Sequence, residues 1–478
     1  MSFGYRILGF GAFQSGDFTI GQSARFNDGD NPELSKSYSI SAPWTFSAWI
    51  KRGELGSENL ILGASGGEIH FNSDDTLEAE GTSSTAVFRD PAGWYHIHVS
   101  NNGLFVNGVS HGSVTTTNLS NQKLFDDFDG YVADVHLRSG TSAVGDYAET
   151  NDDGAWVPKS AGAGEHYFKF ADSSALGTNS GSGGDWTATN IDQMSDSPTD
   201  NHCTLNPLWV DGHTLSDGNL VASAAASSAA IGTMAFDVTD SDGFYFEAKV
   251  TTAATSPAVG IRTIESSSQV GAVTSLSGNS TGLYSFTGSD GTFNDAGSSG
   301  SYGSAWAGTS DKVIGVYVKA GALYFSIDGT IQNSGTAAKT GLTGYMLPTV
   351  FYDASSGTTA AWEMQFDESD WGTTPAGYKS ISTSSLPDPT IVDPSAYFQT
   401  RLYEGNESTK SVDQDGNSDF EPDLVIIKNR DEDDSWVWTD SVREETNILY
   451  SDTTDDEDDD DDTLTAFESD GFALGADV

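Results

Sequence analysis

The chain is poor in cysteine, in basic residues and in long apolar runs, and each shortage argues against particular classes of protein. Its single cysteine, Cys203, excludes an intramolecular disulfide and a cysteine-built metal cage. Basic residues are few: 21 Lys and Arg stand against 70 Asp and Glu, which gives a formal net charge of -49. A chain without a basic face gains little from releasing phosphate counterions or from anionic lipid. We therefore expect neither a nucleic-acid partner nor a membrane partner.

Long apolar runs are also missing. No stretch approaches the roughly 18 apolar residues of a membrane-spanning helix. Arg6 interrupts the apolar residues at the start of the sequence, and no h-region of a secretory signal follows. If the protein works outside a cell, we expect it to leave by another route, of which virion assembly followed by lysis is one.

The acidic composition does not make the chain disordered. Aromatic residues make up 11% of the sequence, and disordered acidic chains are poor in them. The acidity has two interpretations that the sequence leaves open. It keeps a surface soluble in salty water, where repulsion is screened within about 10 Å, or it has a specific role.

Short runs that alternate apolar and polar residues dominate the chain, and turn dipeptides such as Asn107-Gly108 and Asp328-Gly329 separate them. Sustained periodicity of 3.6 residues is scarce. With 53 glycines and a strand every 8–12 residues or so, the pattern predicts an all-β protein of tandem antiparallel β-sandwiches.

Changes in composition divide the chain into blocks. We predict an N-terminal arm over residues 1–16, a first sandwich over 17–172 and a Gly/Ser-rich linker over 173–184. A second sandwich follows over 185–372. A second linker, which contains Pro375, Pro387 and Pro389, spans 373–393, and a C-terminal β module spans 394–478.

The first block resembles the laminin-G-like, concanavalin A-like jelly roll. Five motifs in the order of that family carry the resemblance: residues 23–30 (SARFNDGD), 44–51 (WTFSAWIK), 93–99 (GWYHIHV), 104–109 (LFVNGV) and 128–137 (FDGYVADVHL). The resemblance implies a glycan-binding or spacer domain, sometimes with calcium. Asp28, Asp30 and Asp134 would supply hard oxygen ligands for calcium, and the alternative is that they are solvated carboxylates in turns.

Two histidines of this block, His96 and His98, lie two residues apart on a predicted strand and so share one face. A zinc site needs a third ligand, which the sequence does not place. Paired histidines are ordinary on this strand of laminin-G-like domains.

The second block resembles a SPRY-type sandwich. The motifs are residues 243–250 (GFYFEAKV), 282–286 (GLYSF), 311–318 (DKVIGVYV), 321–330 (GALYFSIDGT) and 362–366 (WEMQF). In SPRY folds the loops set the partner, so the fold does not fix the function. The Gly/Ser-rich loop over 287–305 is a candidate contact surface with Tyr302 as its ligand contact, and a plain flexible loop is the alternative.

The junctions and the third block carry a further resemblance. Residues 184–191 (GDWTATNI) and 195–208 (SDSPTDNHCTLNPL) resemble a block of virion structural proteins from marine tailed phages, where it joins a laminin-G-like to a SPRY-like domain. Residues 420–430 (FEPDLVIIKNR) and 464–475 (LTAFESDGFALG) are similar to another module of phage fibre proteins. Relatives carry further strands after that last motif, so we expect an incomplete module, or one that borrows strands from a neighbour.

Motifs for chemistry are scarce. The acidic run at residues 455–462 lacks the glycine-centred spacing of an EF-hand and is expected to be a solvated loop rather than a calcium site. The sequence has no phosphate-binding loop and no His-Glu-x-x-His helix. Glu247 and Glu363 are conceivable glycosidase carboxylates, but nothing pairs them. We therefore expect no enzyme and no cofactor, with calcium as the one ion to consider.

The leading functional hypothesis is a non-enzymatic virion structural protein, a fibre or decoration subunit located in the virion after assembly in the bacterial cytoplasm. Its expected partners are capsid or tail proteins, further copies of itself and host-surface polysaccharide. We expect the arm to attach it to the particle through Phe3, Tyr5, Ile7, Leu8 and Phe10, because apolar side chains in a short segment need a partner surface. The alternative is that the arm is a first strand of the sandwich. A free glycan-binding lectin or adhesin of a marine or halophilic bacterium, and a glycoside-acting enzyme, remain the other functions.

Overall fold

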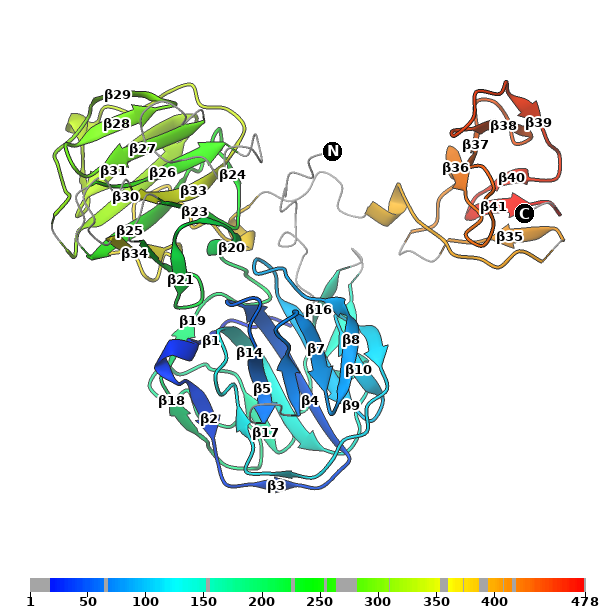
Figure 1. The fold of residues 1–478 in the computed structure, drawn as a ribbon, viewed down its shortest axis with the longest axis horizontal. Helices are drawn as coiled ribbons and strands as arrows, with labels where there is room; N and C mark the ends of the chain where they lie inside the picture. The colour runs from blue at the N-terminus through cyan, green and yellow to red at the C-terminus, as the bar shows by residue number, and fades with distance from the viewer. Residues whose placement is uncertain are drawn as a thin grey trace. The chain divides into compact units, whose positions relative to one another are not determined.

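The computed structural model describes residues 18–63, 68–151, 155–224, 228–252, 256–263, 282–308, 310–352, 360–372, 374–386, 394–406, 408–414 and 418–476. These residues form β-strands and short 3-10 helices, and none of them lies in an α-helix. All the strand pairs within the sheets are antiparallel (Figure 1). The predicted all-β fold class is therefore confirmed. The predicted arm, residues 1–16, lies outside the described residues.

The chain divides into two compact units, Met1–Glu149 with Val157–Asp388 and Thr150–Trp156 with Pro389–Val478. The 3-10 helices are η1 (Asp28–Asp30), η2 (Val144–Asp146), η4 (Asn333–Gly335), η5 (Thr383–Ser385) and η6 (Pro394–Ala396). No helix in the described part of the chain is long and apolar enough to cross a membrane.

The first sandwich packs an eight-stranded sheet on a seven-stranded sheet. The larger sheet contains, in spatial order, β11 (Val109–Gly112), β10 (Gly103–Val106), β9 (Tyr95–Ser100), β4 (Trp44–Arg52), β14 (Gly130–Ser139), β1 (Ser23–Phe26) and β19 (Ile191–Met194), with β17 (His166–Phe168) also on β14. The smaller sheet contains β18 (Thr187–Thr189), β2 (Glu33–Ser35), β13 (Lys123–Leu124), β5 (Asn59–Gly63), β6 (Ile69–Phe71), β7 (Thr76–Ala79) and β8 (Thr82–Val87). Two-stranded sheets pair β12 (Leu119–Ser120) with β3 (Ser39–Ile40) and β15 (Ala148–Thr150) with β16 (Trp156–Pro158).

Strand β4 is buried on both of its faces. Phe46 and Ile50 point into the core between the two sheets, as alternation along a strand requires. Ser47, Trp49 and Lys51 point the other way and are nevertheless buried, because the chain after β14 folds back over the outer face of the larger sheet. The backbone N–H of Ser142, for example, donates to the Thr45 hydroxyl oxygen at 2.9 Å. This covered outer face is where the polar side chains of the first sandwich gather.

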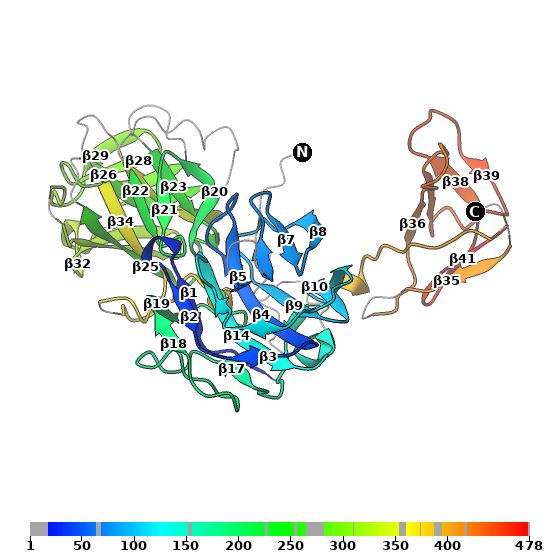
Figure 2. The same cartoon turned by 60° about the horizontal axis from the view of Figure 1, so that its bottom comes forward.

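The segment predicted to open the second sandwich completes the first one. Residues 187–194 form β18 and β19, which pair with β2 and β1 of the first sandwich (Figure 2). The Gly/Ser-rich stretch before them, predicted as a linker, is hydrogen-bonded to the same sandwich: the N–H of Ser180 donates to Tyr167 O, and the N–H of Gly183 donates to Glu165 O. Close packing explains the glycine at position 177, because a Cβ there would lie only 2.0 Å from the carbonyl oxygen of Trp186. The Gly/Ser-rich composition of this stretch therefore reflects tight packing.

The second sandwich also packs an eight-stranded on a seven-stranded sheet. The first contains β20 (Leu205–Asp211), β23 (Ser228–Gly232), β33 (Tyr345–Tyr352), β26 (Pro257–Thr263), β27 (Leu283–Thr287), β28 (Thr292–Asp295) and β29 (Ser298–Ser301), with β24 (Phe236–Asp237) also on β33. The other contains β21 (Thr214–Ser216), β22 (Val221–Ala224), β34 (Ala360–Gln365), β25 (Phe244–Thr252), β30 (Val313–Lys319), β31 (Ala322–Ile327) and β32 (Thr330–Ile331). The predicted second linker begins on this sandwich, because Ile381 is fully buried and its carbonyl accepts from the Cys203 N–H at 2.9 Å.

The C-terminal module is small. A three-stranded sheet of β35 (Lys410–Val412), β41 (Gly471–Leu474) and β40 (Leu464–Glu468) lies with a four-stranded sheet of β36 (Leu424–Ile427), β37 (Val437–Asp440), β38 (Asn447–Tyr450) and β39 (Asp458–Asp459). Its buried apolar cluster is limited to Val412, Val425, Ile427, Leu464 and Leu474.

Candidate functional site

The structure places the three predicted calcium ligands at two separate locations. Asp28 and Asp30 are exposed in η1, which follows the end of β1. Asp134 lies in the bulge of β14, with a φ of 49°, and it is 4% exposed. In the pairing of β1 with β14, Phe26 faces Gly130 and Ala24 faces Val132, so Asp134 lies beyond the opposite end of β1 from η1.

Asp134 is already engaged. It accepts a 2.7 Å hydrogen bond from the Tyr167 hydroxyl, and its other oxygen lies 3.4 Å from Nε2 of His136. Across the described residues, no group of three or more His, Cys, Asp or Glu side chains is placed to hold a metal ion.

The two histidines that share one face of the predicted strand, His96 and His98, lie side by side on the covered outer face of the first sandwich. Nε2 of His96 and the Ser47 hydroxyl are 2.8 Å apart. Burial lowers the pKa of His98 to about 4, and burial together with His98 and His136 keeps the pKa of His96 well below its ordinary value. Both imidazoles are therefore neutral at pH 7, and they pack against Trp49 and Tyr147.

Tyr302, the predicted ligand contact, is a core residue. Its ring is 7% exposed and packs against Phe286, Phe293 and Phe325. Its hydroxyl oxygen lies 3.3 Å from the backbone nitrogen of Phe325, from which it accepts a hydrogen bond. The structure corrects this prediction, because Tyr302 directly follows β29 and its ring is part of the core of the second sandwich. The predicted attachment residues Phe3, Tyr5, Ile7, Leu8 and Phe10 lie outside the described residues.

The two conceivable glycosidase carboxylates occupy neighbouring strands but do not form a cleft. Glu247 is 4% exposed, and the Tyr245 hydroxyl donates to it at 2.5 Å. Gln365 lies opposite Glu247, and Glu363 lies two residues before Gln365 on the same strand. Glu363 forms an ion pair with Lys249 at 3.1 Å.

A group of buried polar residues lies where the two sandwiches meet. Lys51, fully buried on β4, directs its ammonium group to three acceptors: Asp196 Oδ2 at 2.7 Å, Asn201 Oδ1 at 2.8 Å and His202 O at 2.8 Å. These three acceptors match the three donors of an ammonium group. Asp196 in turn accepts from Trp94 Nε1 at 3.1 Å. The buried cation of the first sandwich is therefore held by the segment that leads into the second.

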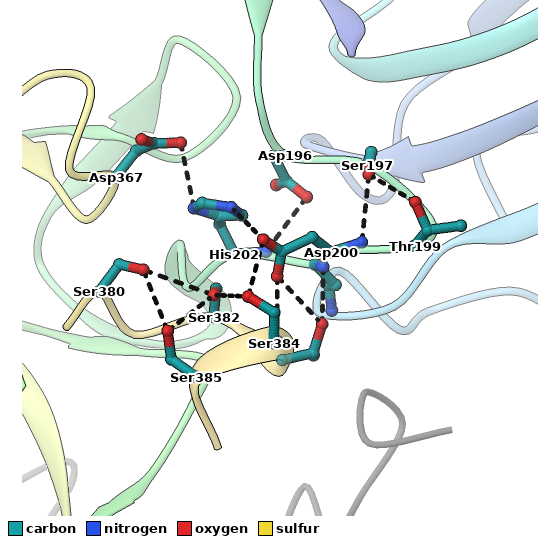
Figure 3. Close-up of polar contacts among 12 residues, drawn as sticks. Asp196, Ser197, Thr199, Asp200, His202, Asp367, Ser380, Ser382, Ser384 and Ser385 are labelled. Carbon is teal, nitrogen blue, oxygen red and sulfur yellow. Dashed lines mark hydrogen bonds and ion pairs between the residues drawn. The ribbon is translucent and has the colours of Figure 1, made fainter. Parts of the chain in front are cut away.

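His202 lies between carboxylates of both parts of the chain, as Figure 3 shows. Its Nδ1 is 3.3 Å from Asp367 Oδ2, just after β34, and its Nε2 is 3.5 Å from Asp200 Oδ2. Burial opposes a charged imidazole, but Asp200, Asp196 and Asp367 outweigh it and raise the pKa of His202 above its ordinary value. Asp200 also accepts from the N–H of Ser384 at 3.0 Å and from its hydroxyl at 2.9 Å.

The ring of His202 contacts carboxylates on both of its nitrogen atoms. In the part of the chain that the structure describes, no serine hydroxyl is bonded to His202, and the ring faces carboxylates on both sides. A nucleophile needs a base within hydrogen-bond reach. The cavity beside it, lined among others by Tyr131, Cys203 and Asp370, has a volume of about 10 Å³, which is room for one water molecule. The arrangement joins two sandwiches and leaves no space for a substrate.

Further hydrogen bonds cross the same junction. The Tyr131 hydroxyl donates to Gly218 O at 2.8 Å, and Asn219 Nδ2 donates to Gly53 O at 2.8 Å. Gly218 has a φ of +61°, and a Cβ there would lie 2.6 Å from the Tyr131 ring, so glycine is required for this close approach. We call the contacts of Lys51, Asp196, Asn201 and His202, together with these two, the polar junction.

The polar junction was not among the expected sites. Lys51 closes the strand motif WTFSAWIK and is followed by Arg52, and a charged residue at the end of a strand is ordinarily solvated, so the motif carries no clear signal. The partners, at residues 196–202 and 367, are too distant in sequence to be assigned without the fold.

The C-terminal module contains a large groove, with a volume of about 1200 Å³. Its lining includes Tyr403, Asn429, Arg430, Asp434 and Tyr450. Two aromatic rings with amide, guanidinium and carboxylate groups provide both stacking and hydrogen bonding, which suits a polar ligand such as a saccharide.

Comparisons with known proteins cover parts of the chain. Residues 393–478 match the family model described as "Domain of unknown function (DUF7483)". No curated protein matches the chain. The family description names no function, so this match leaves the activity of the module to be inferred from its own residues.

Among solved structures, the chain is similar to the SPRY domain of human HERC1, with 9% identity and a TM-score of 0.28, over 34% of this chain and 96% of that chain. It is also similar to stonustoxin, with 17% identity and a TM-score of 0.26, over 34% of this chain and 27% of that chain. A third similar structure is the PSpry domain of TRIM65, with 11% identity and a TM-score of 0.25, over 34% of this chain and 90% of that chain.

Proposed function

We propose that the protein is a non-enzymatic structural protein of a phage particle, a fibre or decoration subunit that projects from the virion. The polar junction is the observation that carries the proposal. A buried lysine with three acceptors and a histidine between two carboxylates fix two sandwiches to each other around a cavity of about 10 Å³. Such a junction suits a rigid spacer and offers no room for a substrate.

The surface chemistry supports the same function. A net charge of -49 keeps a projecting protein soluble in salty water and weakens its attachment to nucleic acid. In this proposal the first sandwich is a laminin-G-like spacer and the second is a SPRY-like binding scaffold. The order of motifs along the chain, which resembles that of virion proteins from marine tailed phages, supports these roles. The proposed partners are capsid or tail proteins and a host-surface polysaccharide, and the proposal requires no cofactor.

The groove of the C-terminal module favours a second candidate function, a free glycan-binding lectin or adhesin. Tyr403 and Tyr450 would stack on sugar rings while Asn429 and Arg430 bond to hydroxyl groups. The two functions differ in where the protein resides rather than in what the groove binds.

Electron microscopy of purified particles, labelled with an antibody against the second sandwich, separates the two. We expect label at regular positions on the particles, and mass spectrometry of the same particles should identify the chain. Particles without the chain, and free protein that binds polysaccharide on a glycan array, would instead establish the lectin. The array is run with and without calcium, and release of reducing sugar from any bound polysaccharide would contradict a non-enzymatic role.

A further inference from the structure

Three residues of the polar junction place an amine, a carboxylate and a carboxamide in contact. Nζ of Lys51 lies 2.7 Å from Oδ2 of Asp196 and 2.8 Å from Oδ1 of Asn201. Lys51 is fully buried, and Asp196 and Asn201 are 3% and 5% exposed. These are the groups that an amide bond between two side chains needs: a nucleophile, a proton acceptor, and an acyl carbon that carries a leaving group.

The carboxamide of Asn201 is fixed in one orientation. Its Nδ2 donates to Ala92 O at 2.7 Å, which turns Oδ1 toward the lysine. Its backbone is held as well, because its N–H donates to the Thr383 hydroxyl oxygen at 2.8 Å and its carbonyl accepts from the Thr383 N–H at 2.9 Å. The fold therefore keeps the carboxamide beside the amine, and two groups held in contact react far faster than two groups that must first meet.

The surroundings of Lys51 favour uncharged groups. The centre of the Tyr131 ring lies 5.5 Å from Nζ of Lys51, and Trp94 packs edge-on against Tyr131. A buried ammonium and a buried carboxylate are each destabilised by the loss of water, so the transfer of one proton from Lys51 to Asp196 lessens that cost. The transfer leaves a neutral amine, whose lone pair is nucleophilic.

We propose that Lys51 and Asn201 form an amide bond between their side chains, an isopeptide bond, with Asp196 as the proton acceptor. Lys51 gives one proton to Asp196, and its Nζ then bonds to Cγ of Asn201. A second proton of Nζ passes to Nδ2 as the Cγ–Nδ2 bond breaks, and ammonia leaves. The third hydrogen stays on the new amide nitrogen, and its acceptor is His202 O, which lies 2.8 Å from Nζ.

The reaction needs no cofactor, oxidant or other reactant. An ammonium, a carboxylate and a carboxamide become an amide, a carboxylic acid and ammonia, so atoms and charge balance. The three side chains are then uncharged, which a buried site favours. The cavity beside Asp196 has a volume of about 10 Å³, which is room for one water molecule and so for one molecule of the ammonia released.

The bond joins the two sandwiches covalently. Lys51 belongs to β4 of the first sandwich, whereas Asn201 lies in the segment that leads into the second and is held there by Thr383. The two residues are 150 positions apart, and closing so long a loop restricts the unfolded chain and thereby stabilises the folded one. The inference goes beyond the proposed function, because the bond forms within one chain and needs neither a particle nor a ligand.

The test is the intact mass of the purified full chain, measured under denaturing conditions. We expect a mass below that of the sequence by one ammonia molecule, and protease digestion should yield a branched peptide that contains both Lys51 and Asn201. A mass equal to that of the sequence would overturn the proposal. So would a loss of ammonia without the branched peptide, because a succinimide at an Asn-Gly pair such as Asn107-Gly108 also releases ammonia.

Two variants and a matched control identify the groups involved. Asn201→Ala removes the acyl carbon and Asp196→Ala removes the proton acceptor, so both should show the full mass of their sequences. Asn219→Ala is the control and should keep the mass deficit, because Asn219 is a buried asparagine of the same junction whose Nδ2 donates to Gly53 O. Circular dichroism checks that each variant folds, and the branched peptide of the natural chain decides the matter where one does not. A deficit that persists in either of the first two variants would contradict the proposed reaction.

Discussion

Nδ1 of His202 lies 3.3 Å from Oδ2 of Asp367, across the boundary between the two sandwiches. The histidine comes from the segment that leaves the first sandwich, and the aspartate follows the last strand of the second. Together with Asp200 on its other nitrogen, this contact makes the junction sensitive to the charge of one imidazole. The charge of His202 therefore changes the free energy of unfolding, which can be measured.

Replacing His202 by Gln should reveal a pH-dependent contribution to stability. Because the folded-state pKa of His202 is raised, its contribution is fully present below about pH 6.5 and is lost as the pH rises through the raised value. We expect His202→Gln to cost about 1–3 kcal/mol at pH 6 and less at pH 8.5, measured by urea unfolding. His111→Gln, which alters a half-exposed histidine of the first sandwich, should show no such decline.

Removing the buried cation should be far more damaging than removing an exposed one. Lys51→Met leaves the carboxylate of Asp196 buried without its ammonium partner, so we expect a loss of about 3–5 kcal/mol in the free energy of unfolding. The matched control is Lys249→Met, which breaks the exposed pair with Glu363 and should cost less than about 1 kcal/mol. Equal losses in the two variants would show that the polar junction is not a buried network.

Asp129 provides a second titration, of a carboxyl group at the same end of the first sandwich. Burial first, and then the carboxylates of Asp28, Glu54 and Asp217, raise its pKa to about 7. A raised carboxyl pKa means that stability is full below about pH 4 and falls as the pH rises toward 7. Asp129→Asn, which removes the titration, should therefore match the natural chain at pH 4 and exceed it by about 2–4 kcal/mol at pH 8. A gain that is independent of pH would contradict this assignment.

The fold class could be predicted from the sequence because alternation with period two is a local signal. The strand motifs lie in strands of the structure, and Phe46 and Ile50 alternate into the core as that signal requires. Composition was a poorer guide: residues 173–184 look like a flexible linker, yet they pack on the first sandwich, since glycine serves close packing as well as flexibility.

The sites depended on long-range contacts that no local pattern encodes. Tyr302 looked exposed because of its Gly/Ser-rich surroundings, although its ring completes an aromatic cluster formed by strands up to 23 residues away. The acceptors of Lys51 lie 145 to 151 residues further along the chain. The calcium prediction grouped Asp134 with Asp28 by chemistry alone, whereas the register of β1 and β14 separates them.

The arm gives a prediction about assembly. Deleting residues 2–16 should abolish incorporation into particles while the purified protein keeps its natural melting temperature, because the apolar side chains of the arm are proposed to contact the particle. The measurement is the amount of the chain per particle by quantitative mass spectrometry. Normal occupancy of the shortened chain would contradict attachment through the arm, and a lowered melting temperature would identify the arm as a strand of the sandwich.

Salt should stabilise this protein more than it stabilises a protein of balanced charge. With a net charge of -49, repulsion between carboxylates opposes the compact state, and monovalent salt at seawater level shortens the range of that repulsion to less than about 10 Å. We expect the melting temperature to rise by several degrees between low salt and seawater salt. Sodium and potassium chloride should act equally, because screening does not depend on the identity of the cation. A variant with residues 455–462 changed to Asn and Gln should respond less, since it carries eight fewer negative charges. A melting temperature that stays constant or falls with salt would show that the acidic surface is not an adaptation to saline media.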